Sequence, residues 1–186
     1  MEIGFAMCGS FCTYAKVLPV LEQLCQYGRV TPIFSEAASH VNSRFGDAEA
    51  HLETARRLSG QEPLLTISQV EPIGPKKLFD ILIIAPCTGN TLAKLACSIA
   101  DGPVTMAAKS HLRNGRPILV AVSTNDGLAG AAENIGKLLA KKHYYFIPFG
   151  QDDPKEKPTS LVADFSQIPQ AMEAALQGKQ LQPILL

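Results

Sequence analysis

Short apolar runs alternate along the chain with longer segments whose apolar residues recur at helical spacing. The apolar runs predict strands and the longer segments predict helices, because strands buried on both faces read as continuous apolar runs. The expected strands cover residues 3–7, 30–34, 65–67, 81–85, 118–122 and 144–149. The expected helices cover residues 13–27, 47–58, 91–100, 103–111, 129–142 and 165–176. This alternation predicts an α/β fold, a doubly wound, mostly parallel sheet with helices on both faces, in a Rossmann-like three-layer arrangement.

Length and charge narrow the class of protein. The 186 residues fit one domain over 1–186, with a surface arm at about 150–163 where the chain becomes polar and contains prolines. The formal net charge is zero, so neither nucleic acid nor a membrane surface is an expected partner, and weak repulsion favours a homo-oligomer. No apolar run approaches the ~18 residues of a membrane helix, and the start reads as a strand rather than a signal segment. We therefore expect a cytoplasmic protein.

Cysteines and histidines give no sign of a disulfide framework or a metal site. The five cysteines have no paired spacing and the four histidines are scattered, so we expect no bound metal. Asp152 and Asp153 form an acidic pair in a loop. Such a pair can hold a metal or a partner's arginine, and solvation is the commoner alternative.

Small polar residues follow the expected strands at the points where each strand ends. Gly9, Ser10 and Phe11 follow the first strand, Ser35 follows the second, and Ser123 opens the loop after residues 118–122. In an open parallel sheet, ligands bind beyond the carboxyl ends of the strands. Each loop also has an ordinary explanation, since serine caps helices and residues 123–127 favour a turn.

The most informative loop follows the strand at 81–85. It consists of Pro86, Cys87, Thr88, Gly89, Asn90 and Thr91. Hydroxyls, an amide and backbone donors at a helix start are suited to a phosphate group. The chain has neither the Gly-x-Gly-x-x-Gly fingerprint of dinucleotide-binding proteins nor a P-loop. The loops therefore predict a phosphate-bearing cofactor that is held without either motif.

These residues resemble a known family, the flavin-dependent cysteine decarboxylase-like flavoproteins. The likeness is carried by Gly9–Ser10, by residues 85–96 (APCTGNTLAKLA) and by residues 99–103. One branch of that family, the B subunits of dipicolinate synthase, is more similar still. The stretches that carry this likeness are 71–76, 84–91, 111–117, 123–127 and 148–154, within a resemblance that runs from residue 3 to about 164.

The resemblance implies a cofactor, a partner and a reaction. It implies flavin mononucleotide (FMN), often held at a subunit interface of a trimer, and a second, A subunit that binds the nicotinamide cofactor NAD(P). The reaction that it implies is oxidation of a tetrahydrodipicolinate-type intermediate of lysine biosynthesis, a small dicarboxylate, to dipicolinate. By the same resemblance, the protein is an oxidoreductase subunit of sporulation in the mother cell of a spore-forming bacterium.

The residues expected to hold the cofactor come from all four loops. They are Gly9, Ser10, Phe11, Ser35, Pro86, Cys87, Thr88, Gly89, Asn90, Thr91 and Ser123. The catalytic residue stays unknown, with Asn125, Cys87 and Lys76 as candidates. Asn125 is similar in place to the asparagine of the decarboxylases' Pro-x-Met-Asn motif, although the proline and methionine are absent.

Cys87 and several cations have competing interpretations. A helix start lowers a thiol pKa and would make Cys87 reactive, whereas a packed, inert thiol is the alternative. Lys76, Lys77, Arg113 and Arg116 can pair with a dicarboxylate or simply be solvated.

Two other functions remain open. Residues 74–80 lack the histidine that the decarboxylases carry there, which counts against a decarboxylase. The third possibility is a non-catalytic assembly subunit with a vestigial pocket.

Overall fold

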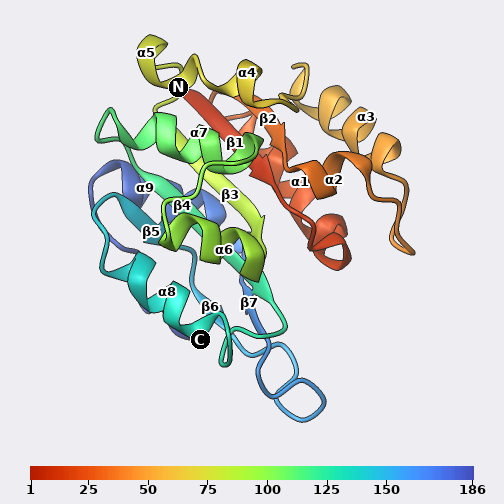
Figure 1. Ribbon diagram of the computed structural model, residues 1–186, viewed down its shortest axis with the longest axis vertical. Helices are drawn as coiled ribbons and strands as arrows, with labels where there is room; N and C mark the ends of the chain where they lie inside the picture. Colours follow the sequence, from red (N-terminus) through yellow and green to blue (C-terminus); the bar gives the residue numbers. More distant parts are fainter.

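Five parallel strands form the centre of a seven-stranded sheet in the computed structural model, which describes residues 1–186 (Figure 1). Their spatial order is β2-β1-β3-β4-β5, because β5 pairs with β4 on the side away from β3. Their bounds are β1 Glu2–Met7, β2 Arg29–Phe34, β3 Ile81–Cys87, β4 Ile118–Thr124 and β5 Tyr144–Phe146. The doubly wound, mostly parallel fold predicted from the sequence is confirmed.

Helices cover both faces of this sheet. Helices α1 and α9 pack on one face and α6, α7 and α8 on the other (Figure 1). Because crossovers between parallel strands are right-handed, a chain that moves first toward one edge of the sheet and then toward the other places its helices on opposite faces. The helical bounds are η1 Phe11–Thr13, α1 Tyr14–Leu24, α2 Glu36–His40, α3 Ala48–Ser59, α4 Ile67–Val70, α5 Ile73–Lys76, α6 Gly89–Ala96, α7 Pro103–Leu112, α8 Ala132–Leu139, η2 Phe165–Gln167 and α9 Ile168–Leu176. None of these helices has the length and apolar character needed to cross a membrane.

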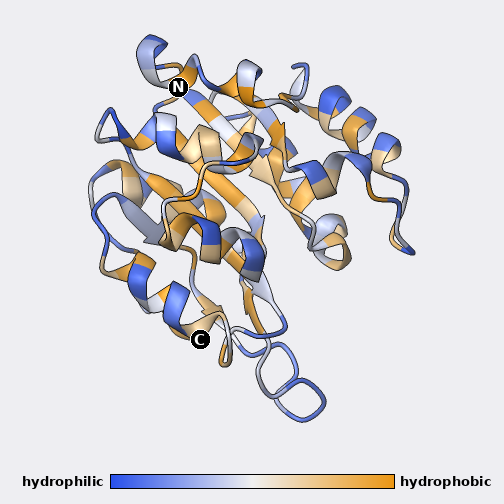
Figure 2. Ribbon diagram, viewed as in Figure 1, coloured by the Kyte–Doolittle hydropathy of each residue, from blue (hydrophilic) through white to orange (hydrophobic).

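The hydrophobic core follows from the apolar runs. Every residue of β3 is buried, and so is every residue of β1 after the first. Figure 2 shows the result, with apolar strands inside and helices whose outer faces are hydrophilic. Burial on both faces explains why these strands lack the polar alternation of a half-exposed sheet.

Two expected elements differ in the structure. The strand predicted at 65–67 is wrong, because only Leu64 bridges to Ile33 and the chain then forms α4. Thr66 accepts a hydrogen bond from the Gln69 amide while the Gln69 side chain accepts from Thr66, a reciprocal cap visible in the sequence as Thr-x-x-Gln. Residues 71–77, where the sequence predicted no helix, contain the short helix α5.

The end of the sheet is antiparallel. The strand predicted at 144–149 is divided into β5 and a second strand, β6 Phe149–Gly150, on either side of Pro148, which lacks an amide donor. Strand β7, Leu161–Ala163, pairs antiparallel with β6 and with the last residues of β4. The connection between β6 and β7 projects from the body of the molecule beside the carboxyl ends of the parallel strands (Figure 1).

Candidate cofactor site

A crevice opens where the strand order reverses, between β1 and β3. The chain leaves β1 toward one side of the sheet and leaves β3 toward the other, so the loops after these strands diverge. Two hollows lie here, of about 690 Å³ and about 540 Å³. Both are lined by Gly9 and Thr88, so they adjoin; we call the pair the crevice, the larger part the first hollow and the smaller part the second hollow.

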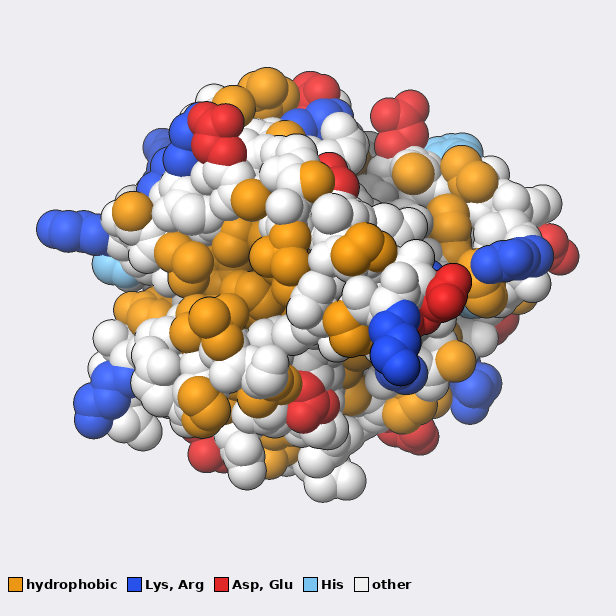
Figure 3. Space-filling model, turned by 90° about the horizontal axis from the view of Figure 1, so that it is seen from below, with side chains coloured by type: hydrophobic (Ala, Val, Ile, Leu, Met, Phe, Trp, Pro, Cys, Tyr) orange, Lys and Arg blue, Asp and Glu red, His pale blue; other side chains and the backbone are white.

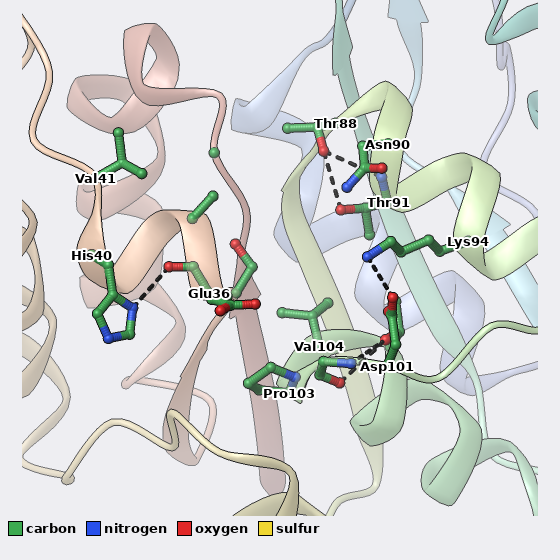
Figure 4. Close-up of a pocket in the computed structure, with 15 residues that line it drawn as sticks. Glu36, His40, Val41, Thr88, Asn90, Thr91, Lys94, Asp101, Pro103 and Val104 are labelled. Atoms are coloured by element: carbon green, nitrogen blue, oxygen red, sulfur yellow. Dashed lines mark hydrogen bonds and ion pairs between the residues drawn. The ribbon is translucent and has the colours of Figure 1, made fainter.

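The first hollow is lined by the starts of three helices. Residues at the beginning of α2, α6 and α7 face it from separate sides (Figure 4). The first amides of a helix lack partners within the helix, and the helix dipole makes that end positive. Three such ends around one hollow favour an anionic group.

Thr88 organises the start of α6. Its Oγ1 accepts a hydrogen bond from the Thr91 amide at 3.3 Å and lies 3.1 Å from the Thr91 hydroxyl oxygen. This cap uses one of the unpaired amides and leaves those of Gly89 and Asn90 for a ligand. A Cβ added at Gly89 would come within 2.8 Å of the Thr124 hydroxyl oxygen and of an Asp126 carboxylate oxygen, so a larger residue would displace side chains where the loops after β3 and β4 meet.

Ser10 connects two loops instead of capping a helix. Its side chain makes no capping hydrogen bond to η1 and lies 2.7 Å from the Ser123 hydroxyl oxygen. The ordinary explanation for Ser10 is therefore wrong, and the first turn after β1 keeps amides that no side chain caps. The loop after β1 also approaches the loop after β2, since a Cβ on Gly9 would lie 3.5 Å from that of Ala37.

Ser35 caps α2, the ordinary explanation that the sequence allowed. Its Oγ accepts from the Ala38 amide at 3.2 Å, and the residue also lines the first hollow. Phe11 lines the second hollow and packs on the core.

Four charged or titratable residues of the first hollow were not singled out from the sequence. They are Glu36, His40, Lys94 and Asp101. The Lys94 ammonium donates to the Asp101 carboxylate at 2.9 Å, and this hydrogen bond lowers the Asp101 pKa. His40 Nδ1 lies 3.0 Å from the Glu36 carbonyl oxygen, one turn back in α2 (Figure 4). The Ser-Glu start of α2 was the available signal, because a capping serine followed by an acidic residue marks a helix start.

The second hollow carries more positive than negative charge. It is lined by Lys16, Arg44, Lys157 and Asp152, and Asp152 lies 3.5 Å from the Lys157 ammonium. Asn125 lines the same hollow, and its carbonyl oxygen accepts from the Thr159 hydroxyl at 2.7 Å. The β6–β7 connection thereby closes one side of the crevice.

Cys87 is a packed side chain. It is completely buried at the end of β3, and burial raises the pKa of its thiol well above the usual value. Neither Pro86 nor Cys87 lines the crevice. The structure therefore contradicts a reactive Cys87 thiol and favours the alternative interpretation.

The four cations proposed to meet a dicarboxylate lie elsewhere. Lys76 and Lys77 directly precede β3, and Arg113 and Arg116 precede β4, so all four lie at the amino edge of the sheet, opposite the crevice. Arg116 lies 3.6 Å from the Asp80 carboxylate and donates to the Lys77 carbonyl at 3.1 Å. Within one chain, these side chains therefore do not reach the cofactor loops.

Comparisons with known proteins agree with this geometry. The chain is 44% identical to the B subunit of dipicolinate synthase of Bacillus subtilis (strain 168), over 186 residues that cover all of this chain and 93% of that protein. The crystal structure of the B subunit of dipicolinate synthase from Bacillus halodurans superposes with a TM-score of 0.90 at 43% identity, covering 99% of this chain and 95% of the other. A Burkholderia xenovorans protein solved in complex with FMN has the same fold, with a TM-score of 0.71 at 18% identity and 94% of each chain covered. A sequence model of the flavoprotein family matches residues 1–162. With this match over most of its length, the chain belongs to the flavoprotein family.

Proposed function

We propose that this chain is the FMN-binding subunit of a two-subunit oxidoreductase that makes dipicolinate from a tetrahydrodipicolinate-type intermediate. The observation that carries the proposal is the crevice at the β1/β3 switch point, where helix starts and small residues from four loops converge. The 44% identity to the B subunit of a dipicolinate synthase supports the choice of reaction.

The crevice fits FMN in size and in donor set. The two hollows of about 690 and 540 Å³ each fall in the range of ligand pockets, and they adjoin at Gly9 and Thr88. The amides of Gly9, Gly89 and Asn90, with the hydroxyls of Ser10 and Thr88, would hold the phosphate, because such donors suit an anion at a helix start. Phe11 and Ser123 then lie beside the flavin in the second hollow.

The side chains of the second hollow are suited to a dicarboxylate. Bound FMN supplies an acceptor for the two electrons that leave the substrate ring. The cations Lys16 and Arg44 pair with carboxylates, and the Asn125 amide can orient one of them by hydrogen bonding. These roles replace the ones that the sequence suggested for Lys76 and its neighbours.

A partner subunit and a homo-oligomer belong to the same proposal. Apolar side chains gather over part of the face seen in Figure 3. Exposed apolar patches of this kind mark protein interfaces. We place there a contact with another subunit, and assign NAD(P) binding to an A subunit in the mother cell of a spore-former.

Reconstitution with an A subunit tests the function. Dipicolinate formation is measured with the A subunit alone, with the wild-type chain added, and with the Asn90→Ala variant, whose side chain is exposed at the crevice. We expect full activity only with the wild-type chain loaded with FMN. Equal rates from the A subunit alone would instead assign this chain a purely structural role.

A further inference from the structure

A third hollow, of about 490 Å³, lies between α7 and the connection from α8 to β5. We call it the basic hollow. It faces the same side of the sheet as α6 (Figure 1). Thr105, in the first turn of α7, lines both this hollow and the first hollow of the crevice, so the two spaces adjoin at the start of α7.

The charge of the basic hollow is one-sided. Its lining contains five basic side chains, and it includes no aspartate or glutamate. None of the five takes part in an ion pair with the protein. Because the formal net charge of the whole chain is zero, this concentration is a local feature. The five are Lys109, Arg113, Lys141, Lys142 and His143.

The basic side chains come from two walls. Lys109 on α7 and Arg113, the capping residue directly after α7, are four residues apart, and Arg113 keeps helical dihedral angles, so both lie on the same face of the helix. Lys142 and His143 belong to the connection before β5. The fifth, Lys141, is already engaged, since its ammonium donates to the carbonyl oxygens of Leu95 and Ala96 at the end of α6, at 3.2 and 2.7 Å.

Apolar side chains complete the basic hollow. Leu95 and Tyr144 are buried, Leu112 is half-buried, and all three line it. A ligand there would meet cations on two sides and an apolar surface between them. This arrangement suits a compact apolar body that carries two separated anionic groups, rather than a hydrated inorganic ion.

We propose that the basic hollow binds a small organic dicarboxylate, with one carboxylate between Lys109 and Arg113 and the other beside Lys142 and His143. Guanidinium and ammonium groups bind carboxylates through short, charge-assisted hydrogen bonds. This site is separate from the cofactor crevice and does not depend on flavin. It goes beyond the proposed function, which places a dicarboxylate only in the second hollow.

Calorimetric titration tests the proposal with pyridine-2,6-dicarboxylate as the probe and the full chain saturated with FMN. Because the proposed function also places a dicarboxylate in the second hollow beside bound FMN, every titration is made in a Lys16→Gln/Arg44→Gln background, so that the remaining binding reports on the basic hollow. In that background we expect one site per chain, and pyridine-2-carboxylate should bind about tenfold more weakly, because it loses one set of charge-assisted bonds. Binding should also weaken at high salt, since the side chains are exposed.

Substitutions locate the site. Arg113→Gln and Lys142→Gln should each weaken binding of the probe about tenfold, and both residues are exposed, so the fold should be kept. Lys179→Gln is the matched control, because Lys179 is an exposed lysine outside all three hollows. Circular dichroism checks that each variant is folded.

Three results would overturn the proposal. The FMN-saturated background chain could show no binding at millimolar probe. Adding Arg113→Gln and Lys142→Gln together to that background could leave the affinity unchanged. The monocarboxylate could bind as tightly as the dicarboxylate.

Discussion

The substitution Thr88→Val separates two roles that the structure gives to one hydroxyl. Valine keeps the shape of threonine and removes Oγ1, which caps α6 through the Thr91 amide at 3.3 Å. Loss of such a cap costs about 1 kcal/mol of stability. For a chain of this length, that corresponds to a fall in melting temperature of roughly 2–4 °C.

The same substitution should weaken flavin binding by more than the cap alone explains. If the hydroxyl also donates to the flavin phosphate, its removal costs a further ~1.5–3 kcal/mol of binding free energy, because the acceptor is charged. The expected result is about a tenfold to hundredfold rise in the FMN dissociation constant. Flavin fluorescence on titration with FMN measures it.

Thr66→Val is a closely matched control. Thr66 caps α4 through the Gln69 amide, also at 3.3 Å, and it lies outside the crevice. We expect both variants to lose similar stability and only Thr88→Val to lose flavin affinity. Unchanged FMN affinity in Thr88→Val, or an equal loss in Thr66→Val, would refute the assignment of Thr88 to the phosphate site.

Three further predictions concern stability, pH and thiol access. Gly4→Ala should destabilise the fold by about 1–3 kcal/mol in urea unfolding, because the new Cβ would lie 2.6 Å from a ring carbon of the buried Phe79. Gly136→Ala should instead stabilise the fold by about 0.5–1 kcal/mol, because Gly136 lies inside α8 with open space around it. Burial lowers the His111 pKa to about 4, so between pH 6.5 and pH 4 the unfolded chain binds a proton at His111 that the folded chain does not. The free energy of unfolding should therefore fall by roughly 3 kcal/mol as the pH is lowered over this range. A His111→Gln variant whose stability falls equally with pH would contradict this cause. A thiol reagent should modify the exposed Cys12 in the folded chain and reach Cys87 only on unfolding, and saturating FMN should slow the reaction at Cys12, which lines the second hollow.

The sequence predicted the parallel part of the sheet because each of its strands is buried on both faces. The run Ile81–Cys87 is apolar over its whole length, and its seven residues suit a strand and are too few for an ordinary helix. The antiparallel end was not predicted. Strand β6 has two residues and β7 has three, which is too few for a periodicity to be read.

The candidate site was predicted in outline and misjudged in detail. Because the carboxyl ends of parallel strands share one edge of the sheet, the loops after β1, β2, β3 and β4 had to meet, and they do. The same reasoning, applied strictly, places the catalytic candidate Lys76 outside the crevice, since it precedes a strand. Residue type alone had suggested it.

Other features of the site depend on tertiary contacts that no local pattern carries. Ser10 reads as a helix cap, yet its hydroxyl lies against Ser123, 113 residues away. Burial of Cys87 depends on the packing around the end of β3, while its place before a helix had left both a reactive and a packed thiol open. The basic hollow likewise joins α7 to a connection about 30 residues later in the chain.

Titration of the flavin-free chain with FMN and with riboflavin tests the central claim most directly. The visible absorption and fluorescence of the flavin report binding. The account predicts one FMN per chain, and much weaker binding of riboflavin, because the helix starts of the crevice hold the phosphate. No spectral change with excess FMN, or equal affinity for the two flavins, would contradict it.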